Sequence, residues 1–159
     1  TAVSVLGLFD IPSSKLSTIQ TNAHLTPKAI REALRRFSTH SYTADKNIAV
    51  QSIQDLGEIA DPEQNEQQTI NTLNAANKEL VIALGGDNSI TYAAALGVYG
   101  QRLSTAGLIT LDAHHDLRDG NSTGSPVRRL IEAGLNPKKI VQIGSNYFFN
   151  SYDISFLTI

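Results

Sequence analysis

The sequence predicts an α/β protein with three layers, in which helices cover both faces of a mostly parallel sheet. Short extended apolar segments alternate with segments of helical periodicity from one end of the 159-residue chain to the other. The connections between these segments are short, and right-handed crossovers place such helices on the faces of a parallel sheet. No repeat or linker interrupts the alternation. We therefore expect residues 1–159 to form a single α/β domain.

Five strands are expected from the apolar segments. The continuous apolar run at residues 80–84 is typical of a strand buried in a parallel sheet. The expected strands span residues 2–9, 48–53, 80–84, 107–111 and 140–143. Residues 156–159 are apolar again and predict the start of a sixth strand that the sequence does not complete.

Four helices are expected between the strands. Three begin at a Thr, Asp or Ser followed by Pro, which combines an N-cap with a residue suited to the first turn. These starts are Thr26-Pro27, Asp61-Pro62 and Ser125-Pro126, and the remaining helix spans about residues 90–98. Apolar residues at helical spacing predict the faces that pack inward: Ile30, Ala33, Leu34 and Phe37 in the first helix, Ile70 and Leu73 in the second, and Val127, Leu130 and Ile131 in the last.

Composition and charge argue against several classes of function. Thirteen Lys and Arg residues against 15 Asp and Glu give a formal net charge of −2. The sequence therefore lacks the basic footprint expected for nucleic acid or an anionic membrane surface as the main partner. No apolar run approaches the length of a membrane-spanning helix. The absence of cysteine excludes disulfides and thiolate metal sites. We expect a cytoplasmic protein that acts on a small molecule.

A cluster of potential metal ligands follows the strand expected at residues 107–111. It reads Asp112-Ala113-His114-His115-Asp116. If the backbone stays extended, side chains two residues apart point the same way, so Asp112, His114 and Asp116 converge while His115 points elsewhere. Two carboxylates and an imidazole suit Mn²⁺ or a similar divalent ion. The alternative is a strand end whose Asp residues merely cap the next turn.

A second polar cluster, Gly85-Gly86-Asp87-Asn88-Ser89, follows the strand at residues 80–84. Paired glycines let the backbone pass close to a ligand or to a neighbouring strand. Asn88 is a candidate oxygen ligand or a hydrogen-bond donor to a ligand. The alternative is a plain turn into a helix, with Asp87 or Ser89 as its N-cap. In open α/β sheets ligands bind at the carboxyl ends of the strands, where both clusters are expected to lie.

These two clusters resemble the motifs of the ureohydrolases, the family of arginases, agmatinases and formimidoylglutamases. The resemblance includes Pro27-Lys28-Ala29-Ile30-Arg31 in the first helix. Asn88, His115, Leu117-Arg118 and residues 124–129 are most similar to formimidoylglutamases. The resemblance implies an arginase-like fold, a homo-oligomer (trimer or hexamer), and hydrolysis of N-formimidoyl-L-glutamate to L-glutamate and formamide in histidine breakdown.

The resemblance also implies a pair of Mn²⁺ ions bridged by hydroxide. Asp112 would bridge both ions and His114 would bind one of them. Asp116 would bind the other and accept a hydrogen bond from the nucleophile. Asn88 falls where arginases have a metal-binding histidine, and its amide is a poorer ligand for Mn²⁺ than imidazole.

The sequence departs from the family pattern in three places. No Asp-x-Asp pair follows Asp116 to complete a two-metal site, so we expect the chain to be the N-terminal part of the fold, truncated at its C-terminus. Thr123 stands where arginases have a histidine, so no proton-shuttle role carries over to it. The stretch 117–123 is also shorter than in the family.

Other polar residues are weaker candidates. Arg128, in the first turn of a helix, is a candidate partner for a substrate carboxylate, and Asn146 is a second candidate for substrate contact. His24 and His40 are expected to be ordinary surface histidines.

Three other functions remain open. An agmatinase or other guanidino hydrolase would take a cationic substrate in the same kind of site. A catalytically silent, metal-poor subunit is favoured by Asn88 and by the missing carboxylate pair. A phosphate-binding domain built on Gly85-Gly86 ranks last, because the chain lacks Gly-x-Gly-x-x-Gly spacing and a P-loop lysine.

Overall fold

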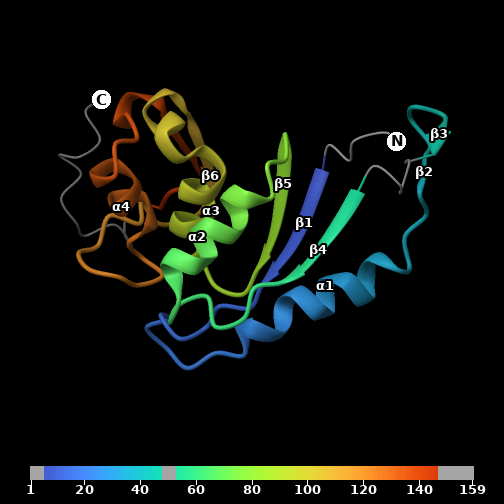
Figure 1. The fold of residues 1–159 in the computed structure, drawn as a ribbon, viewed down its shortest axis with the longest axis horizontal. Coiled ribbons are helices and arrows are strands. Elements are labelled where there is room, and N and C mark those ends of the chain that lie inside the picture. The colour runs from blue at the N-terminus through green and yellow to red at the C-terminus, as the bar shows by residue number, and fades with distance from the viewer. Residues whose placement is uncertain (1–5, 48–52, 147–159) are drawn as a thin grey trace.

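The computed structural model describes residues 6–47 and 53–146 of the chain (Figure 1). Its larger sheet has three parallel strands in the order β4-β1-β5. These strands are β1 (Leu6–Ile11), β4 (Ile53–Glu58) and β5 (Leu80–Gly85). Strands β6 (Leu108–Leu111) and β7 (Ile140–Ile143) form a second parallel pair.

The helices carry the chain between these strands. They are α1 (Thr26–Leu34), α2 (Glu66–Ala75), α3 (Ile90–Tyr99) and α4 (Pro126–Glu132), with short 3₁₀ turns at Ala23–Leu25, Gly100–Thr105 and Pro137–Lys139. Figure 1 shows α2, α3 and α4 gathered on one side of the molecule. Within the described ranges, no helix has the length and apolar character needed to cross a bilayer.

Two apolar cores join the helices to the sheets. Phe9 and Ile11 of β1 are buried against Leu73 of α2 and against partly buried residues of α3. Leu103, Leu130 and Leu135 form the second core, next to β6 and β7. Helices α2 and α3 approach closely at Gly97, where a Cβ atom would lie 2.5 Å from Leu73 Cβ. Close packing of this kind requires glycine in α3.

Helix α1 lies on the opposite face of the larger sheet. Its Arg31 donates to Asp10 at 2.7 and 2.8 Å and to Asp55 at 2.7 and 2.9 Å. Asp10 alternates with Phe9 and Ile11 along β1, so its side chain points away from the core that those residues form. Helices thus contact both faces of a parallel sheet, which confirms the predicted α/β class.

The predicted strands agree best in the second half of the chain. The expected ranges 80–84, 107–111 and 140–143 match β5, β6 and β7 to within one residue. Residues 2–5, 48–52 and 156–159 of the other expected strands lie outside the described residues. Beyond them, β1 extends to Ile11, and β4 begins where the strand expected at 48–53 was to end.

Two features of the strands differ from the prediction. The strands do not all join one sheet, because β5 and β6 share no ladder of hydrogen bonds. The short antiparallel hairpin of β2 (His40–Ser41) and β3 (Lys46–Asn47) was not predicted. Its two-residue strands carry no alternating apolar pattern that would indicate them.

Two helix starts also differ from the prediction. Thr26 is the first residue of α1, not its N-cap, because the preceding 3₁₀ turn leads directly into the helix. Helix α2 begins at Glu66, since residues after Asp61 form turns that lead to an N-cap at Asn65. Ser125 does precede α4 as predicted, although its side chain makes no capping hydrogen bond.

The apolar stripe predicted for α1 is largely exposed. Leu34 and Phe37 are 52% and 73% exposed, and only Pro27 of α1 is buried. Arg31 of the same helix forms ion pairs with Asp10 of β1 and Asp55 of β4. The predicted inward faces of α2 and α4 agree with the structure, where Leu73, Val127 and Leu130 are buried.

One face of the β6–β7 pair is apolar and open to solvent. Alternate residues of these strands point away from the core beside α3 and α4, and they are exposed over more than half of their surface: Ile109, Leu111, Val141 and Ile143. Within residues 6–47 and 53–146, helices cover only the other face of this pair.

Candidate metal centre

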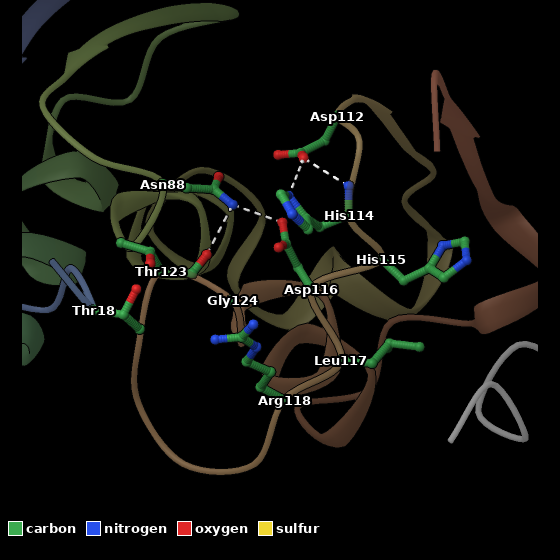
Figure 2. A pocket seen from close by; sticks show the side chains of 10 residues that line it. All are labelled: Thr18, Asn88, Asp112, His114, His115, Asp116, Leu117, Arg118, Thr123 and Gly124. Atoms are coloured by element: carbon green, nitrogen blue, oxygen red, sulfur yellow. Dashed lines mark hydrogen bonds and ion pairs between the residues drawn. The ribbon is translucent and has the colours of Figure 1, made fainter. Parts of the chain in front are cut away.

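A pocket of about 250 Å³ lies where β5 and β6 end at their carboxyl sides (Figure 2). It brings together the two polar clusters that the sequence singled out. Its lining residues are Thr18, Asn88, Asp112, His114, His115, Asp116, Leu117, Arg118, Thr123 and Gly124. This position is the one expected for a ligand site in an open α/β sheet.

Asp112 and His114 form one side of the pocket. The backbone nitrogen of Asp112 donates to Ile143 O at 3.0 Å, which fixes the end of β6 to the end of β7. Asp112 Oδ1 then accepts from the backbone nitrogen of His114 at 2.8 Å and lies 3.2 Å from His114 Nδ1. The carboxylate therefore shapes the turn and orients the imidazole at the same time.

Asp116 is the buried carboxylate of the pocket, with 7% of the residue exposed. Its backbone adopts a φ of +55°, in the left-handed region, and its carbonyl accepts from Arg128 N at 3.1 Å. Burial, followed by the negative charge of Asp112, raises the pKa of Asp116 to about 6. The hydrogen bond from Asn88 and the charges of His114 and Arg118 oppose this rise.

The backbone from Asp112 to Asp116 does not stay extended, contrary to the prediction. The strand ends at Leu111, and a side chain–backbone turn at Asp112 and the left-handed residue Asp116 bend the chain. The three predicted ligands nevertheless line one pocket. His115 points away from them in Figure 2 and pairs with Gln142 through Nδ1 and Oε1 at 2.7 Å.

Asn88 binds Asp116 directly. Its Nδ2 donates to Asp116 Oδ2 at 2.6 Å and to Thr123 O at 3.1 Å, while its Oδ1 accepts from Thr91 Oγ1 at 2.9 Å. Two acceptors on one side of the amide and a hydroxyl on the other determine its orientation. Of the two roles expected for Asn88, this geometry corresponds to the hydrogen-bond donor.

The paired glycines allow the close backbone approach that the sequence predicts. A Cβ atom on Gly86 would lie 1.9 Å from Ser13 O, and one on Gly85 would lie 2.3 Å from Ile90 Cδ1. The neighbour that comes close is the chain after β1, since the backbone nitrogen of the next residue, Asp87, donates to Ser13 O at 3.1 Å. The turn after β5 is therefore built against this segment.

Arg128 and Asn146, the two weaker candidates for substrate contact, are not among the residues that line the pocket. The Arg128 guanidinium pairs with Asp119 at 2.7 Å and with Glu132 at 2.9 Å. Asn146 is exposed, and its backbone nitrogen donates to Ala113 O at 2.8 Å. His24 is exposed outside this pocket, and His40 lies in β2, 3.7 Å from Asp45.

Arg118 and Thr18 line the pocket, although neither was predicted as a site residue. A Cβ atom on Gly124 would lie 2.8 Å from Arg118 Cδ, so glycine at this position makes room for the arginine side chain. Arg118 could have been predicted as a site residue from its position two residues after Asp116. Thr18 had no such signal, because the chain after β1 carries no recognisable motif.

The donor types fit a manganese ion, but the arrangement supplies only part of a coordination shell. Asp112, Asp116 and His114 offer carboxylate oxygens and an imidazole nitrogen, which suit Mn²⁺. The raised pKa of Asp116 beside Asp112 indicates two carboxylates that a cation would stabilise. Among the residues that the structure describes, no three His, Asp or Glu side chains are already placed to hold a metal ion.

A parallel α/β fold with carboxylates and an imidazole at the strand ends defines a class of proteins with a ligand site at this edge of the sheet. The chain belongs to the arginase family, which matches residues 4–157.

Similar proteins come from two bacteria. The chain is 36% identical over 160 residues to a formimidoylglutamase of Halalkalibacterium halodurans, covering 92% of this chain and 50% of that protein. It is 31% identical over 157 residues to a formimidoylglutamase of Bacillus subtilis, with 91% and 49% covered. The crystal structure of formimidoylglutamase from Bacillus subtilis has a TM-score of 0.82 and 30% identity, with 92% and 49% covered. The chain thus spans about half the length of these relatives.

Proposed function

We propose that this chain forms part of a manganese-dependent hydrolase that cleaves the C–N bond of a linear amidine. The proposed substrate is N-formimidoyl-L-glutamate, which water converts to L-glutamate and formamide. The observation that carries this proposal is the buried carboxylate of Asp116, held beside Asp112 and His114 in one pocket. The similarity to two formimidoylglutamases supports the choice of substrate.

Asp112, His114 and Asp116 would hold the metal. A bound Mn²⁺ lowers the pKa of its water and supplies the nucleophile. Asn88 holds Asp116 in place through the 2.6 Å hydrogen bond to Oδ2. In the metal-free chain burial raises the pKa of Asp116 to about 6, and a cation bound beside it would favour its charged form. Asp112 orients the imidazole of His114 through its Oδ1.

Arg118 favours an acidic substrate over a cationic one. Its guanidinium is a permanent positive charge on the pocket lining, and arginine binds carboxylates with two parallel hydrogen bonds. The proposed substrate carries two carboxylates, whereas agmatine and other guanidines are cations. Arg118 thus takes the role that the sequence suggested for Arg128, and it disfavours the agmatinase alternative.

Replacing Asp112 by Asn tests the proposed metal site. We expect Asp112→Asn to abolish Mn²⁺ binding in calorimetric titration while the circular dichroism spectrum stays unchanged, because the shape is kept and the charge is lost. Asp119→Asn is the matched control: Asp119 follows the same motif but lies outside the pocket, paired with Arg128. Wild-type affinity in Asp112→Asn would overturn the proposed site.

A catalytically silent subunit remains the second candidate. It is favoured by the incomplete ligand set among the described residues. Native mass spectrometry after incubation with Mn²⁺ separates the two, because it reports chain mass and metals per chain together. Bound metal supports the hydrolase, and a chain without metal supports the silent subunit. The cytoplasmic location and the trimeric or hexameric assembly stay predictions.

A further inference from the structure

Asp87 joins two segments that are distant in sequence and that both lead into the pocket. One is the turn after β5, which contains Asn88. The other is the entry segment, residues 13–18, which follows β1 and ends at Thr18. Thr18 and Asn88 line the pocket (Figure 2).

The contacts of Asp87 reach both segments. Its Oδ2 accepts from Ser17 Oγ at 2.9 Å, across 70 residues of sequence. Its Oδ1 accepts from the backbone nitrogen of Ser89 at 3.1 Å and from Ser89 Oγ. Its backbone nitrogen donates to Ser13 O at 3.1 Å and to Ser13 Oγ at 3.0 Å. Each carboxylate oxygen therefore serves a different segment.

Burial makes the bonds to Ser13 and Ser89 hard to replace by water, whereas the bond between Asp87 and Ser17 is partly buried. Ser13 is fully buried and Ser89 is 6% exposed. A buried hydroxyl that loses its partner costs more free energy than an exposed one, because water does not restore the bond. The backbone contact between Gly86 and Ser13 leaves no space for a side chain at position 86.

A plain helix cap does not account for this arrangement. The sequence offered Asp87 or Ser89 as the N-cap of the next helix, and Ser89 occupies that position without a capping side-chain bond. The bond from Asp87 Oδ1 to Ser89 serves the turn alone. The bond from Oδ2 to Ser17 adds nothing to the helix, and it fixes the residue next to Thr18.

A second link to the entry segment comes from Thr123, which also lines the pocket. Thr123 N donates to Leu16 O at 3.3 Å, and Thr123 O accepts from Asn88. Asp87, Ser17, Leu16, Thr123 and Asn88 thus form a closed circuit of contacts around the pocket. Asn88 connects these contacts to Asp116, because its Nδ2 donates to Asp116 Oδ2.

We propose that Asp87 is a positioning residue that fixes Thr18 and Asn88 on the pocket wall through Ser17 and Ser89. It touches none of the groups proposed to react. Its effect on the metal rests on the proposed function, because it acts through Asn88 on Asp116. Its effect on the entry segment stands independently of that function.

The test compares wild type, Asp87→Ala, Asp87→Asn and Ser17→Ala by amide hydrogen exchange and by titration with Mn²⁺ alone. We expect Asp87→Ala to speed exchange of the Thr123 amide, which donates to Leu16 O, and of the residue 87 amide, which donates to Ser13 O, by about tenfold, as for the loss of one charge-assisted hydrogen bond. The Mn²⁺ dissociation constant should rise by a similar factor. Asp87→Asn should retain near wild-type values, because its amide still bonds to both serines.

Asp61→Asn is the matched control. Asp61 pairs with Lys15 of the same entry segment at 2.9 Å, but on its exposed side and outside the pocket. We expect it to leave both readouts unchanged. Ser17→Ala removes the Asp87 bond from the other end, and it should loosen the same amides with less effect on folding. The double variant Ser17→Ala/Asp87→Ala should show no faster amide exchange than Asp87→Ala alone, since the two residues share one interaction.

Each result decides the proposal. Local acceleration in Asp87→Ala and Ser17→Ala, absent in Asp61→Asn, supports it. Exchange that is unchanged, or that rises evenly along the whole chain, overturns it. If wild type binds no Mn²⁺, the proposed function fails, and the amide exchange still decides whether Asp87 positions the entry segment.

Discussion

Burial decides the proton affinity of Asp116 more than any of its partners does. Only 7% of the residue is exposed, and the neighbouring charge of Asp112 adds to the effect of burial. Asn88, His114 and Arg118 favour the charged form without compensating fully. Asp116 therefore binds a proton more tightly in the folded chain than in the unfolded one.

The metal-free chain should lose stability as the pH rises from about 4 to about 6. The pKa of Asp116 rises from 3.8 to about 6 on folding. Its contribution is fully present below pH 4 and is lost as the pH rises through 6. Urea unfolding at several pH values should show this loss in wild type relative to Asp116→Asn. A difference between the two that is constant with pH would contradict the assignment.

The sequence predicted which residues lie at the site, and the structure changes how they reach it. Residue types and their place after two strands were enough to select Asp112, His114, Asp116 and Asn88, which all line the pocket. The extended backbone predicted for residues 112–116 was wrong, because the left-handed conformation of Asp116 is stabilised by contacts distant in sequence. Local periodicity carries no information on such contacts.

At the scale of elements, an ion pair joins three helices. Arg129 of α4 donates to both carboxylate oxygens of Glu66, in α2, at 2.8 and 2.6 Å. Its guanidinium also lies 3.6 Å from the centre of the Tyr92 ring, in α3. Arg129 lies in the last turn of α4, where the helix dipole favours a cation. Its two partners therefore act at a position that already suits a positive charge.

Arg129→Ala should destabilise the chain by about 2 kcal/mol, because it leaves the half-buried Glu66 carboxylate without its partner. Arg128→Ala is the matched control, one residue away on the same helix. Arg128 pairs with Asp119 and Glu132, whose side chains are 86% and 54% exposed. Exposed pairs of this kind contribute under about 1 kcal/mol. Urea unfolding of both variants measures the difference, and equal losses would show that Arg129 does not hold the helices together.

The elements that the sequence located well are those whose own residues determine them. Strands β5 to β7 are apolar runs bounded by polar residues or glycine, and α3 is rich in alanine, so propensity and burial agree there. Helix α1 shows that apolar spacing alone does not predict how a helix packs. Its apolar spacing predicts a stripe that packs on the sheet, yet Leu34 and Phe37 stay exposed, while Arg31 of the same helix pairs with Asp10 of β1. Spacing identifies an amphipathic helix without identifying what its apolar side contacts.

At the scale of the whole molecule, the described residues leave one apolar sheet face open. Ile109, Leu111, Val141 and Ile143 alternate with residues that pack toward α3 and α4. Leu111 alone is 82% exposed. Contiguous apolar surface of this kind is typical of a contact surface, because an isolated soluble domain normally covers it. The relatives are about twice as long as this chain, so they contain further polypeptide that this chain does not match.

Replacing Leu111 and Val141 together by Thr tests whether this face is open in solution. Threonine is favoured in strands and both side chains are exposed, so the free energy of unfolding should change by less than about 1 kcal/mol. Binding of an apolar dye and self-association in sedimentation velocity should both decrease. Val127→Thr is the control, because Val127 is 1% exposed and a buried hydroxyl there should cost about 1–3 kcal/mol. If the double variant is destabilised as much as the control, the face is already covered in solution, because only buried apolar side chains contribute that much to stability.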